Sequence, residues 1–404
     1  MSISFDNTEN AFEYKSTAQL KKARFLFSSM SFQSLVKIGT WITPRILSLG
    51  LPVNGLIRNT IFTQFVGGET LEETAAVGKL LRQYGVQVIL DYGVEGKEGE
   101  NNFDHSTDEF IRVINYASTQ PNMPFMSVKI TGIARFGLLE KLDAAANGHS
   151  GATGVVHTEV LSEVEQAEWE RVTSRMERII QTAAAKNVGV LIDAEESWVQ
   201  DPVDAITMQM MEKYNKEKIV VYNTIQLYRH DRLQFLKDSE AYAQAGNFIL
   251  GAKLVRGAYM EKERKRAVEQ NIASPIQPDK AATDRDYNAA IEFCVKHIHN
   301  IAFIVASHNE YSNLFATQQM QAKGLPLNHP HIHFSQLYGM SDNITFNLAK
   351  AGCPVSKYLP FGPIKDVIPY LMRRAQENSS VKGQTGRELG LIKKELQRRM
   401  KIQN

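Results

Sequence analysis

The sequence predicts an α/β fold of the (β/α)8 TIM-barrel class. After residue 66, eight short apolar runs rich in β-branched residues alternate with longer amphipathic segments. Runs that are apolar throughout are typical of strands buried on both faces, and helices between them indicate a parallel sheet. Eight such units over about 300 residues fit a barrel of this class, which commonly takes ~250 residues plus insertions. A doubly wound open sheet is the alternative.

The eight predicted strands follow one another at the spacing of β/α units. They cover residues 86–93, 125–133, 188–196, 218–226, 249–259, 301–309, 331–339 and 356–362. Helical patterns are clear in the intervening segments 163–186 and 282–298. Residues 137–162 are predicted to be an insertion after the second strand. Its GHSGATG motif is predicted to be a loop, because it does not follow a strand and open a βαβ unit as a nucleotide-binding motif does.

The ends of the chain are predicted to be helical. We interpret residues 1–66 as an N-terminal helical arm and residues 67–404 as the barrel domain, with a final helix over 384–401 whose basic residues form a solvated face. Residues 34–57 are the most apolar segment, and two charged residues and two prolines interrupt them: Lys37, Pro44, Arg45 and Pro52. A membrane span is therefore not expected. A packed arm and a surface lying on a membrane face both remain open.

Composition narrows the class of protein. The formal net charge of +2 argues against a nucleic-acid binder, which usually carries a strong basic excess. Cys294 and Cys353 are the two cysteines, and no CxxC is present, which fits a reducing compartment and argues against a cysteine zinc site. Asp6, Glu9 and Glu13 make the N-terminus acidic, so neither a secretory signal nor a transit peptide is expected.

Polar residues mark the carboxyl ends of all eight predicted strands, where barrels of this class carry their active sites. They are Asp91, Lys129, Asp193 with Glu195 and Glu196, Gln226, Lys253 with Arg256 and Tyr259, Ser307 with His308 and Asn309, Gln336, and Tyr358. Polar groups within apolar runs cost free energy unless they are paired, so a ring of them predicts a site. Any one residue can instead serve a structural ion pair, as Asp193 can with Lys253 or Lys129.

Metal binding is not expected. The HPHIH segment spaces His329, His331 and His333 like ligands, but no carboxylate or cysteine joins them at ligand spacing. The DAEE segment, 193–196, resembles a divalent-cation site in composition, but two or three of its acidic residues can equally form ion pairs at the rim of the barrel.

Two adjacent arginines, Arg373 and Arg374, lie in the predicted helix YLMRRAQEN, residues 370–378. Neighbours on a helix point about 100° apart, so one of the two can face water. Two guanidinium groups beside a barrel mouth suit one small carboxylate, because each offers a planar pair of donors. Glu377 lies four residues after Arg373 and can hold it in place. The alternative is one exposed arginine and one ion pair at the rim.

Four segments taken together resemble the FAD-dependent proline dehydrogenases of the monofunctional type. They are DAEES, LVRGAYMEKER, ASHN and YLPFGPIKDVIPYLMRRAQEN, in the order that the family has them. The resemblance covers about residues 85–380, and the paired arginines and the LVRGAY segment are its most specific signals. It implies a distorted (β/α)8 barrel that holds FAD without a covalent bond, with the last barrel helix over the barrel mouth.

The resemblance also implies which residues bind L-proline: Lys129, Leu254, Tyr259, Tyr358, Arg373, Arg374 and Glu377. Arg373 and Arg374 would grip the carboxylate, with Lys129 beside them and Glu377 steadying the arginines. Tyr358 would pack against the substrate ring. Relatives that act on hydroxyproline tend to have a smaller residue there, so the tyrosine favours proline.

For the cofactor, the resemblance implies an active-site pair beside the flavin, Asp193 and Lys253. The positions implied to contact FAD are Ala194, Gln226, Arg256, Gly257, Ala258, Ser307 and His308. Two of these residues depart from the common pattern. Lys253 stands where many bacterial members have arginine, which keeps the charge but not the two-pronged geometry. Ser307 stands where threonine is common and keeps the hydroxyl.

The implied activity is oxidation of L-proline to Δ1-pyrroline-5-carboxylate, the first step of proline catabolism to glutamate. Electrons would pass to a membrane quinone, which would give the apolar segment a peripheral membrane role. We expect a cytoplasmic protein or one on the inner membrane face, on the matrix side in a eukaryote. A separate pyrroline-5-carboxylate dehydrogenase would take the product. Alternatives are a hydroxyproline dehydrogenase, a barrel lyase or aldolase using Lys129 or Lys253 as a Schiff base, and a non-catalytic scaffold.

Overall fold

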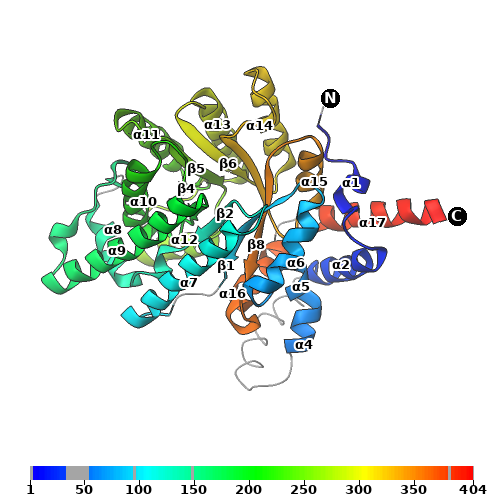
Figure 1. Cartoon of the computed structure of the whole chain (residues 1–404), viewed down its shortest axis with the longest axis horizontal. Helices are drawn as coiled ribbons and strands as arrows, with labels where there is room; N and C mark the ends of the chain where they lie inside the picture. The colour runs from blue at the N-terminus through cyan, green and yellow to red at the C-terminus, as the bar shows by residue number, and fades with distance from the viewer. Residues whose placement is uncertain (1–2, 33–53, 94–96, 147–149, 381–383, 404) are drawn as a thin grey trace. The chain divides into compact units, whose positions relative to one another are not determined.

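The computed structural model describes residues 3–32, 54–93, 97–146, 150–380 and 384–403 (Figure 1). Most of the apolar segment 34–57 therefore lies outside the described residues, apart from the short helix α4 (Asn54–Ile57). The two interpretations of that segment, a packed arm and a membrane-lying surface, both stay predictions. Among the helices that the structure does describe, none is long and apolar enough to cross a membrane.

Eight parallel strands close into a barrel in chain order, which confirms the predicted class and shows that the open-sheet alternative is wrong. The strands are β1 (Gln87–Tyr92), β2 (Phe125–Val128), β3 (Gly189–Ile192), β4 (Val221–Gln226), β5 (Leu250–Val255), β6 (Ile301–Ala306), β7 (Ile332–Leu337) and β8 (Val355–Phe361). Several end earlier than the apolar runs suggested. The polar residues that closed those runs, such as Asp193, lie in the loops that follow.

The chain divides into two compact units, one made of residues 1–95 and 336–404 and the other of residues 96–335. The helices of the second unit are α7 (Glu100–Ser118), α8 (Phe136–Ala145), α9 (Glu163–Lys186), α10 (Gln200–Tyr214), α11 (Arg232–Ala245), α12 (Met260–Gln270), α13 (Lys280–Lys296) and α14 (Glu310–Ala322). Short 3-10 turns lie at η2 (Ile130–Gly132), η3 (Ser150–Thr153), η4 (Thr158–Val160) and η5 (Ser197–Val199). Helices α10, α11 and α13 line the outside of strands β4 to β6 (Figure 1).

Capping explains where the predicted helices begin. Helix α9 covers the predicted residues 163–186 because Ser162 and Glu165 form a capping box at its start and Asn187, at φ 54°, ends it. Helix α13 begins two residues before the predicted start, since the Asp279 side chain accepts a hydrogen bond from the Ala282 N–H. The predicted 137–162 insertion contains most of α8. Gly151 packs against α10, where a Cβ would lie 2.8 Å from the Asp201 carbonyl oxygen.

The first unit holds β1, β8 and a second set of helices. These are α1 (Thr8–Phe12), α2 (Thr17–Met30), α4, α5 (Thr63–Phe65), α6 (Leu71–Arg82), α15 (Asp342–Lys350), α16 (Ile364–Ser380) and α17 (Gln384–Gln403), with one π-helical stretch, η1 (Arg58–Phe62). Helix α17 runs beside α1 and α2, so the two ends of the chain pack together (Figure 1). The expected domain boundary at residue 66 stays a prediction.

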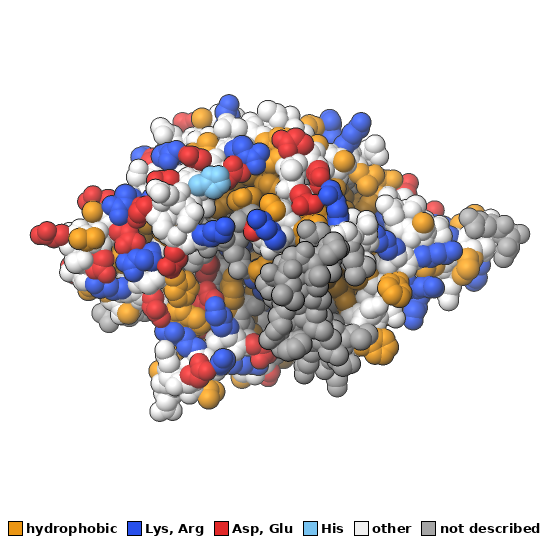
Figure 2. Space-filling model, turned by 90° about the horizontal axis from the view of Figure 1, so that it is seen from below, with side chains coloured by type: hydrophobic (Ala, Val, Ile, Leu, Met, Phe, Trp, Pro, Cys, Tyr) orange, Lys and Arg blue, Asp and Glu red, His pale blue; other side chains and the backbone are white. Residues whose placement is uncertain are grey.

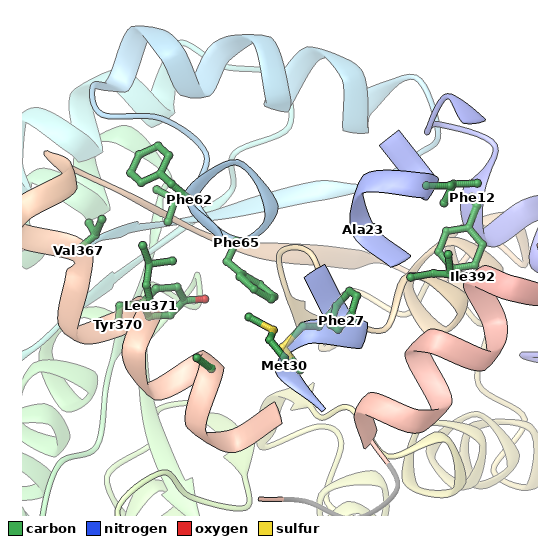
Figure 3. Close-up of a cluster of buried hydrophobic side chains, with 14 of the residues drawn as sticks. Phe12, Ala23, Phe27, Met30, Phe62, Phe65, Val367, Tyr370, Leu371 and Ile392 are labelled. Carbon is green, nitrogen blue, oxygen red and sulfur yellow. The ribbon is translucent and has the colours of Figure 1, made fainter. Parts of the chain in front are cut away.

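A buried apolar cluster joins the N-terminal helices of this unit to α16 (Figure 3). Phe27 from α2 lies edge-on to Phe65 from α5, with ring centroids 6.1 Å apart. Val367 and Leu371 on α16 are spaced four residues apart, so they present one face of the helix to this cluster. The N-terminal arm thus packs against the helix that carries the two adjacent arginines.

The surface carries charges of both signs. Lysine and arginine side chains are interspersed with aspartate and glutamate over much of the face that Figure 2 shows. On that face, the pattern is typical of a solvated globular surface rather than of one large field of a single sign.

Candidate active site

Three of the predicted residues meet at the carboxyl ends of β2, β3 and β5. The Lys129 ammonium lies 3.2 Å from Asp193 Oδ2, and the Lys253 ammonium bonds the other carboxylate oxygen, Oδ1. The Asp193 N–H donates to the carbonyl of Val128, 2.9 Å away, which extends the pairing of β2 with β3 by one residue. One carboxylate therefore holds two ammonium groups in this unit.

The two lysines differ in exposure. The Lys253 side chain is 7% exposed and that of Asp193 is 13% exposed, whereas the Lys129 side chain is 35% exposed. Because its side chain is the more exposed, Lys129 is better placed than Lys253 to meet a dissolved anion.

Two of the three acidic residues of DAEE, Asp193 and Glu196, form ion pairs, whereas Glu195 is held by hydrogen bonds. Its buried carboxylate accepts two hydrogen bonds from Thr131, from the backbone N–H at 3.1 Å and from the hydroxyl at 2.8 Å. Burial raises the pKa of Glu195 to about 7, although the two Thr131 bonds and the Lys129 charge oppose that shift. The neighbouring Glu196 does form the expected kind of pair, with Lys262 of α12.

Arg256, at the end of β5, has a guanidinium group bound largely by other protein groups. Its Nε donates to Asp284 of α13 at 2.9 Å, and its two terminal nitrogens donate to the hydroxyls of Ser307 at 2.7 Å and Ser312 at 3.0 Å. The same group lies 4.3 Å from the centre of the Tyr287 ring. Burial would raise the pKa of Asp284, but hydrogen bonds from Lys280 and Arg256 outweigh it and lower that pKa.

The backbone conformation and the packing of the protein require a glycine at position 257. Its φ is +135°, and a Cβ at this position would lie 2.4 Å from ring atoms of Tyr228. A tyrosine ring therefore lies against this glycine, and the implied contact of Gly257 with FAD stays a prediction. Ala258, next in the chain, is exposed, and Tyr259 is partly buried.

The remaining predicted cofactor and substrate positions of this unit lie at or near the strand ends. Leu254 is fully buried and Ala194 nearly so. Gln226 at the end of β4 donates its amide N–H to the Glu195 carbonyl, 3.1 Å away. Ser307 is buried, and His308 beside it is partly exposed.

The other predicted substrate residues lie in the first unit. Arg373 is partly exposed and Arg374 is 8% exposed, with its guanidinium 5.2 Å from the Tyr370 ring centre. Tyr358 on β8 is partly buried, and its carbonyl accepts from the Tyr338 N–H at 2.9 Å. The side chain of Glu377 lies outside the described residues, so its pairing with Arg373 stays a prediction.

The spaced histidines serve the fold. His333 is buried on β7 with its ring edge-on to Phe125, and burial lowers its pKa to about 3. His331 bonds the Ile298 carbonyl at 2.8 Å through Nδ1. Over the described parts of the chain, no group of three or more metal-binding side chains is suitably placed to hold a metal ion.

Comparison with known proteins assigns the chain to a family. The family model for proline dehydrogenase matches residues 75–387, which span every site residue described above. The chain belongs to the proline dehydrogenase family. It is 34% identical to mitochondrial proline dehydrogenase 1 of Dictyostelium discoideum, over 88% of this chain and 67% of that protein. It is 32% identical to hydroxyproline dehydrogenase of Xenopus laevis, over 96% of this chain and 89% of that protein.

A solved structure supports the fold of this proline dehydrogenase family member. The chain superposes on proline utilization A (PutA) from Bdellovibrio bacteriovorus with a TM-score of 0.70, over 94% of this chain. The two are 19% identical, so the likeness shows the fold alone, and the match spans 38% of that longer chain.

The residues present fit a flavin at one specific point. Gln226 Oε1 is buried and accepts no hydrogen bond from the described residues, while its Nε2 is engaged by the Glu195 carbonyl. An unsatisfied buried acceptor costs free energy, and a flavin ring offers an N–H that could satisfy it. The guanidinium of Arg256 is a less simple match to a phosphate of FAD. Most of its donors already bond protein groups, so the phosphate would have to share the guanidinium with Asp284.

Sequence reasoning missed the partners that hold these residues. Thr131, Asp284 and Ser312 each bond a predicted site residue, yet each lies in an unremarkable helix or turn. Thr131 could have been found from its place two residues after Lys129, within the second predicted strand. No spacing in the sequence connects Asp284 or Ser312 with Arg256.

Proposed function

We propose that the chain oxidises L-proline to Δ1-pyrroline-5-carboxylate with FAD as its bound cofactor. The observation that carries this is the match to the proline dehydrogenase family over residues 75–387, which makes the chain an oxidoreductase of that type. Supporting it, Lys129, Asp193 and Lys253 form one ionic array at the carboxyl ends of the strands, where barrels of this class place their chemistry.

FAD, when bound, would supply the acceptor for the hydride that leaves the ring carbon next to the proline nitrogen. The residues that would hold it are Ala194, Gln226, Arg256, Gly257, Ala258, Ser307 and His308. Gln226 offers a buried acceptor. Arg256 offers positive charge, and Asp284, Ser307 and Ser312 keep it in one orientation. Lys253, held by Asp193, would keep a positive charge beside the reacting atoms.

The substrate carboxylate would be bound by three cations, Lys129, Arg373 and Arg374. Lys129 would contribute its partly exposed ammonium, and Arg373 and Arg374 their planar donor pairs. Glu377 would steady the arginines, while Leu254, Tyr259 and Tyr358 would orient the ring. That these residues act on one substrate molecule is part of the proposal and is supported by the family resemblance. Orientation of the ring carbon then accounts for most of what the protein itself contributes.

Hydroxyproline dehydrogenation is the second candidate, because a hydroxyproline dehydrogenase is among the relatives with the fullest coverage. Tyr358 favours proline, since a ring hydroxyl needs space and a polar partner beside it. The Schiff-base rival is disfavoured by Asp193. The Asp193 carboxylate holds the Lys253 nitrogen in a hydrogen bond, whereas a Schiff-base lysine needs that nitrogen as its nucleophile.

Electrons would leave for a membrane quinone, and the product would pass to a separate pyrroline-5-carboxylate dehydrogenase. We place the protein in the cytoplasm or on the inner face of a membrane, on the matrix side in a eukaryotic cell. The relative from Dictyostelium is named as mitochondrial, which accords with the latter.

Steady-state kinetics with a soluble electron acceptor test the proposal. L-Proline should be turned over with a higher kcat/KM than trans-4-hydroxy-L-proline. Arg373→Met should raise the KM for proline by about 10- to 100-fold, the loss expected for a charge-assisted hydrogen bond, and should leave the flavin bound. No turnover of either substrate by the flavin-loaded protein would refute the proposed function. An unchanged KM in the variant would refute the role of Arg373.

A further inference from the structure

Glu195 is buried two residues after Asp193, and both of its carboxylate oxygens serve Thr131. Oε1 accepts from the Thr131 N–H at 3.1 Å, and Oε2 accepts from the Thr131 hydroxyl at 2.8 Å. Thr131 is the middle residue of the turn η2, for which Lys129 is the preceding N-cap residue. The Glu195 carboxylate therefore holds the backbone at Thr131, two residues after Lys129.

The backbone of Glu195 is held as firmly as its side chain. Its N–H donates to Gln200 Oε1 at 2.7 Å, and its carbonyl accepts from Gln226 Nε2 at 3.1 Å. Gln200 in turn donates to Asp204, which also accepts from Asn223 on β4. These bonds tie the loop after β3 to β4 and to α10, so Glu195 presents its carboxylate to Thr131 from a rigid support.

Because the Glu195 carboxylate is buried, loss of its hydrogen bonds would cost free energy. Burial raises its pKa to about 7, while the two Thr131 donors and the Lys129 charge act in the opposite direction and Glu196 adds to the rise. In such a poorly solvated place a hydrogen bond is stronger, and a lost one is not replaced by water at low cost.

We propose that Glu195 is a positioning residue for the substrate. Through the turn that it fixes at Thr131, it holds the Lys129 ammonium in register with Asp193, where that ammonium meets the proline carboxylate. This inference deepens the proposed function and rests on it, because Lys129 takes part in the reaction only as a substrate ligand. Glu195 itself touches no reacting atom.

The test compares variants of the FAD-loaded enzyme in KM, kcat and flavin content per chain. Glu195→Ala should raise the proline KM by about 10- to 100-fold, with a smaller loss in kcat and unchanged flavin content. Glu195→Gln should restore the KM to within about threefold of the parent, because its amide can accept from the Thr131 N–H and donate to the Thr131 hydroxyl oxygen. Glu196→Gln, which loses the Lys262 pair in the same loop and leaves both Thr131 bonds in place, is the matched control and should keep the parent KM.

Thr131→Val provides a second variant that deletes only the hydroxyl, should Glu195→Ala fail to fold. It should raise the KM for proline and leave the flavin in place. A parent KM in both Thr131→Val and Glu195→Ala would overturn the proposal. So would a loss of kcat and flavin content at constant KM, since that is the signature of a merely structural role. If the parent enzyme itself does not oxidise proline, the proposed function fails first and this inference falls with it.

Discussion

Replacing Asp342 with asparagine tests how much the buried ion pairs of Asp342 with Lys15 and Lys357 stabilise the protein. Asp342 lies on α15, and its Oδ1 is 2.9 Å from the ammonium of Lys357 on β8, a side chain with 0% exposure. Its Oδ2 accepts from the Tyr14 hydroxyl at 2.8 Å and from the Lys15 ammonium at 2.9 Å. The Lys357 ammonium also donates to the Met340 carbonyl at 2.5 Å. Asparagine would keep the shape but would leave the buried Lys357 charge without its carboxylate.

The structure sets the size of the effect. Burial alone would raise the pKa of Asp342, but Lys15 and Lys357 lower it to about 2 from an ordinary 3.8. That difference corresponds to about 2 kcal/mol of stability at neutral pH. Stranding a buried partner charge typically costs more, about 3–5 kcal/mol, and Lys357 is such a partner. We therefore expect Asp342→Asn to lower the free energy of unfolding by about 3–5 kcal/mol, or roughly 5 °C in Tm for 404 residues.

Urea unfolding at several pH values measures this loss of unfolding free energy and shows in which direction the loss changes with pH. Because the folded pKa of Asp342 is depressed, its contribution is fully present above about pH 4 and is lost as the pH falls toward 2. The difference in unfolding free energy between the parent and Asp342→Asn should thus be constant near neutral pH. It should narrow below about pH 4.

A double variant gives the decisive control. Adding Lys357→Met to Asp342→Asn removes the stranded charge and places an apolar side chain of similar length in the same buried position. Replacing a buried ion pair by apolar groups is often neutral, so the double variant should be more stable than the single one. A single variant within about 0.5 kcal/mol of the parent, the range of ordinary surface changes, would refute the reasoning, and so would a double variant less stable than the single.

Three further changes probe the site. Leu371→Ala should lower the free energy of unfolding by about 2–5 kcal/mol in urea and raise the proline KM, because Leu371 anchors the helix that carries Arg373. An unchanged KM would mean that the packing of Leu371 does not determine the position of Arg373. Gly257→Ala should lower flavin content, measured by absorbance, since φ +135° and the Tyr228 ring both oppose a Cβ; full flavin content would contradict this. Tyr358→Ser should shift the kcat/KM ratio toward hydroxyproline by about tenfold, and no shift would remove Tyr358 from the specificity determinants.

The sequence predicted the barrel because its signals are local. Each strand is an apolar run bounded by polar residues, and each helix has the 3.6-residue period, so all eight strands were found. Helix boundaries depend on caps, and the start of α13 at Lys280, after the N-cap Asp279, shows what a periodicity argument leaves out. The π-helical stretch η1 has no sequence signal comparable to these.

The site was predictable where it lies on strand ends and unpredictable where it depends on packing. Lys129, Asp193 and Lys253 were placed at three strand ends, and closure of the barrel brings the three together. That two or three of the DAEE acids can form ion pairs was predictable from their charge, but which of them instead bonds Thr131 across two loops was not. The contact of Gly257 with Tyr228 was likewise unpredictable, because it exists only in three dimensions.

The visible spectrum of the purified protein, recorded without oxygen before and after L-proline, tests the central claim most directly. We predict a yellow protein whose flavin bands bleach when proline is added, which would establish cofactor, substrate and hydride transfer in one observation. A yellow protein that bleaches only with hydroxyproline would keep the fold and the cofactor and change the substrate. A colourless protein that cannot be reconstituted with FAD would contradict the account.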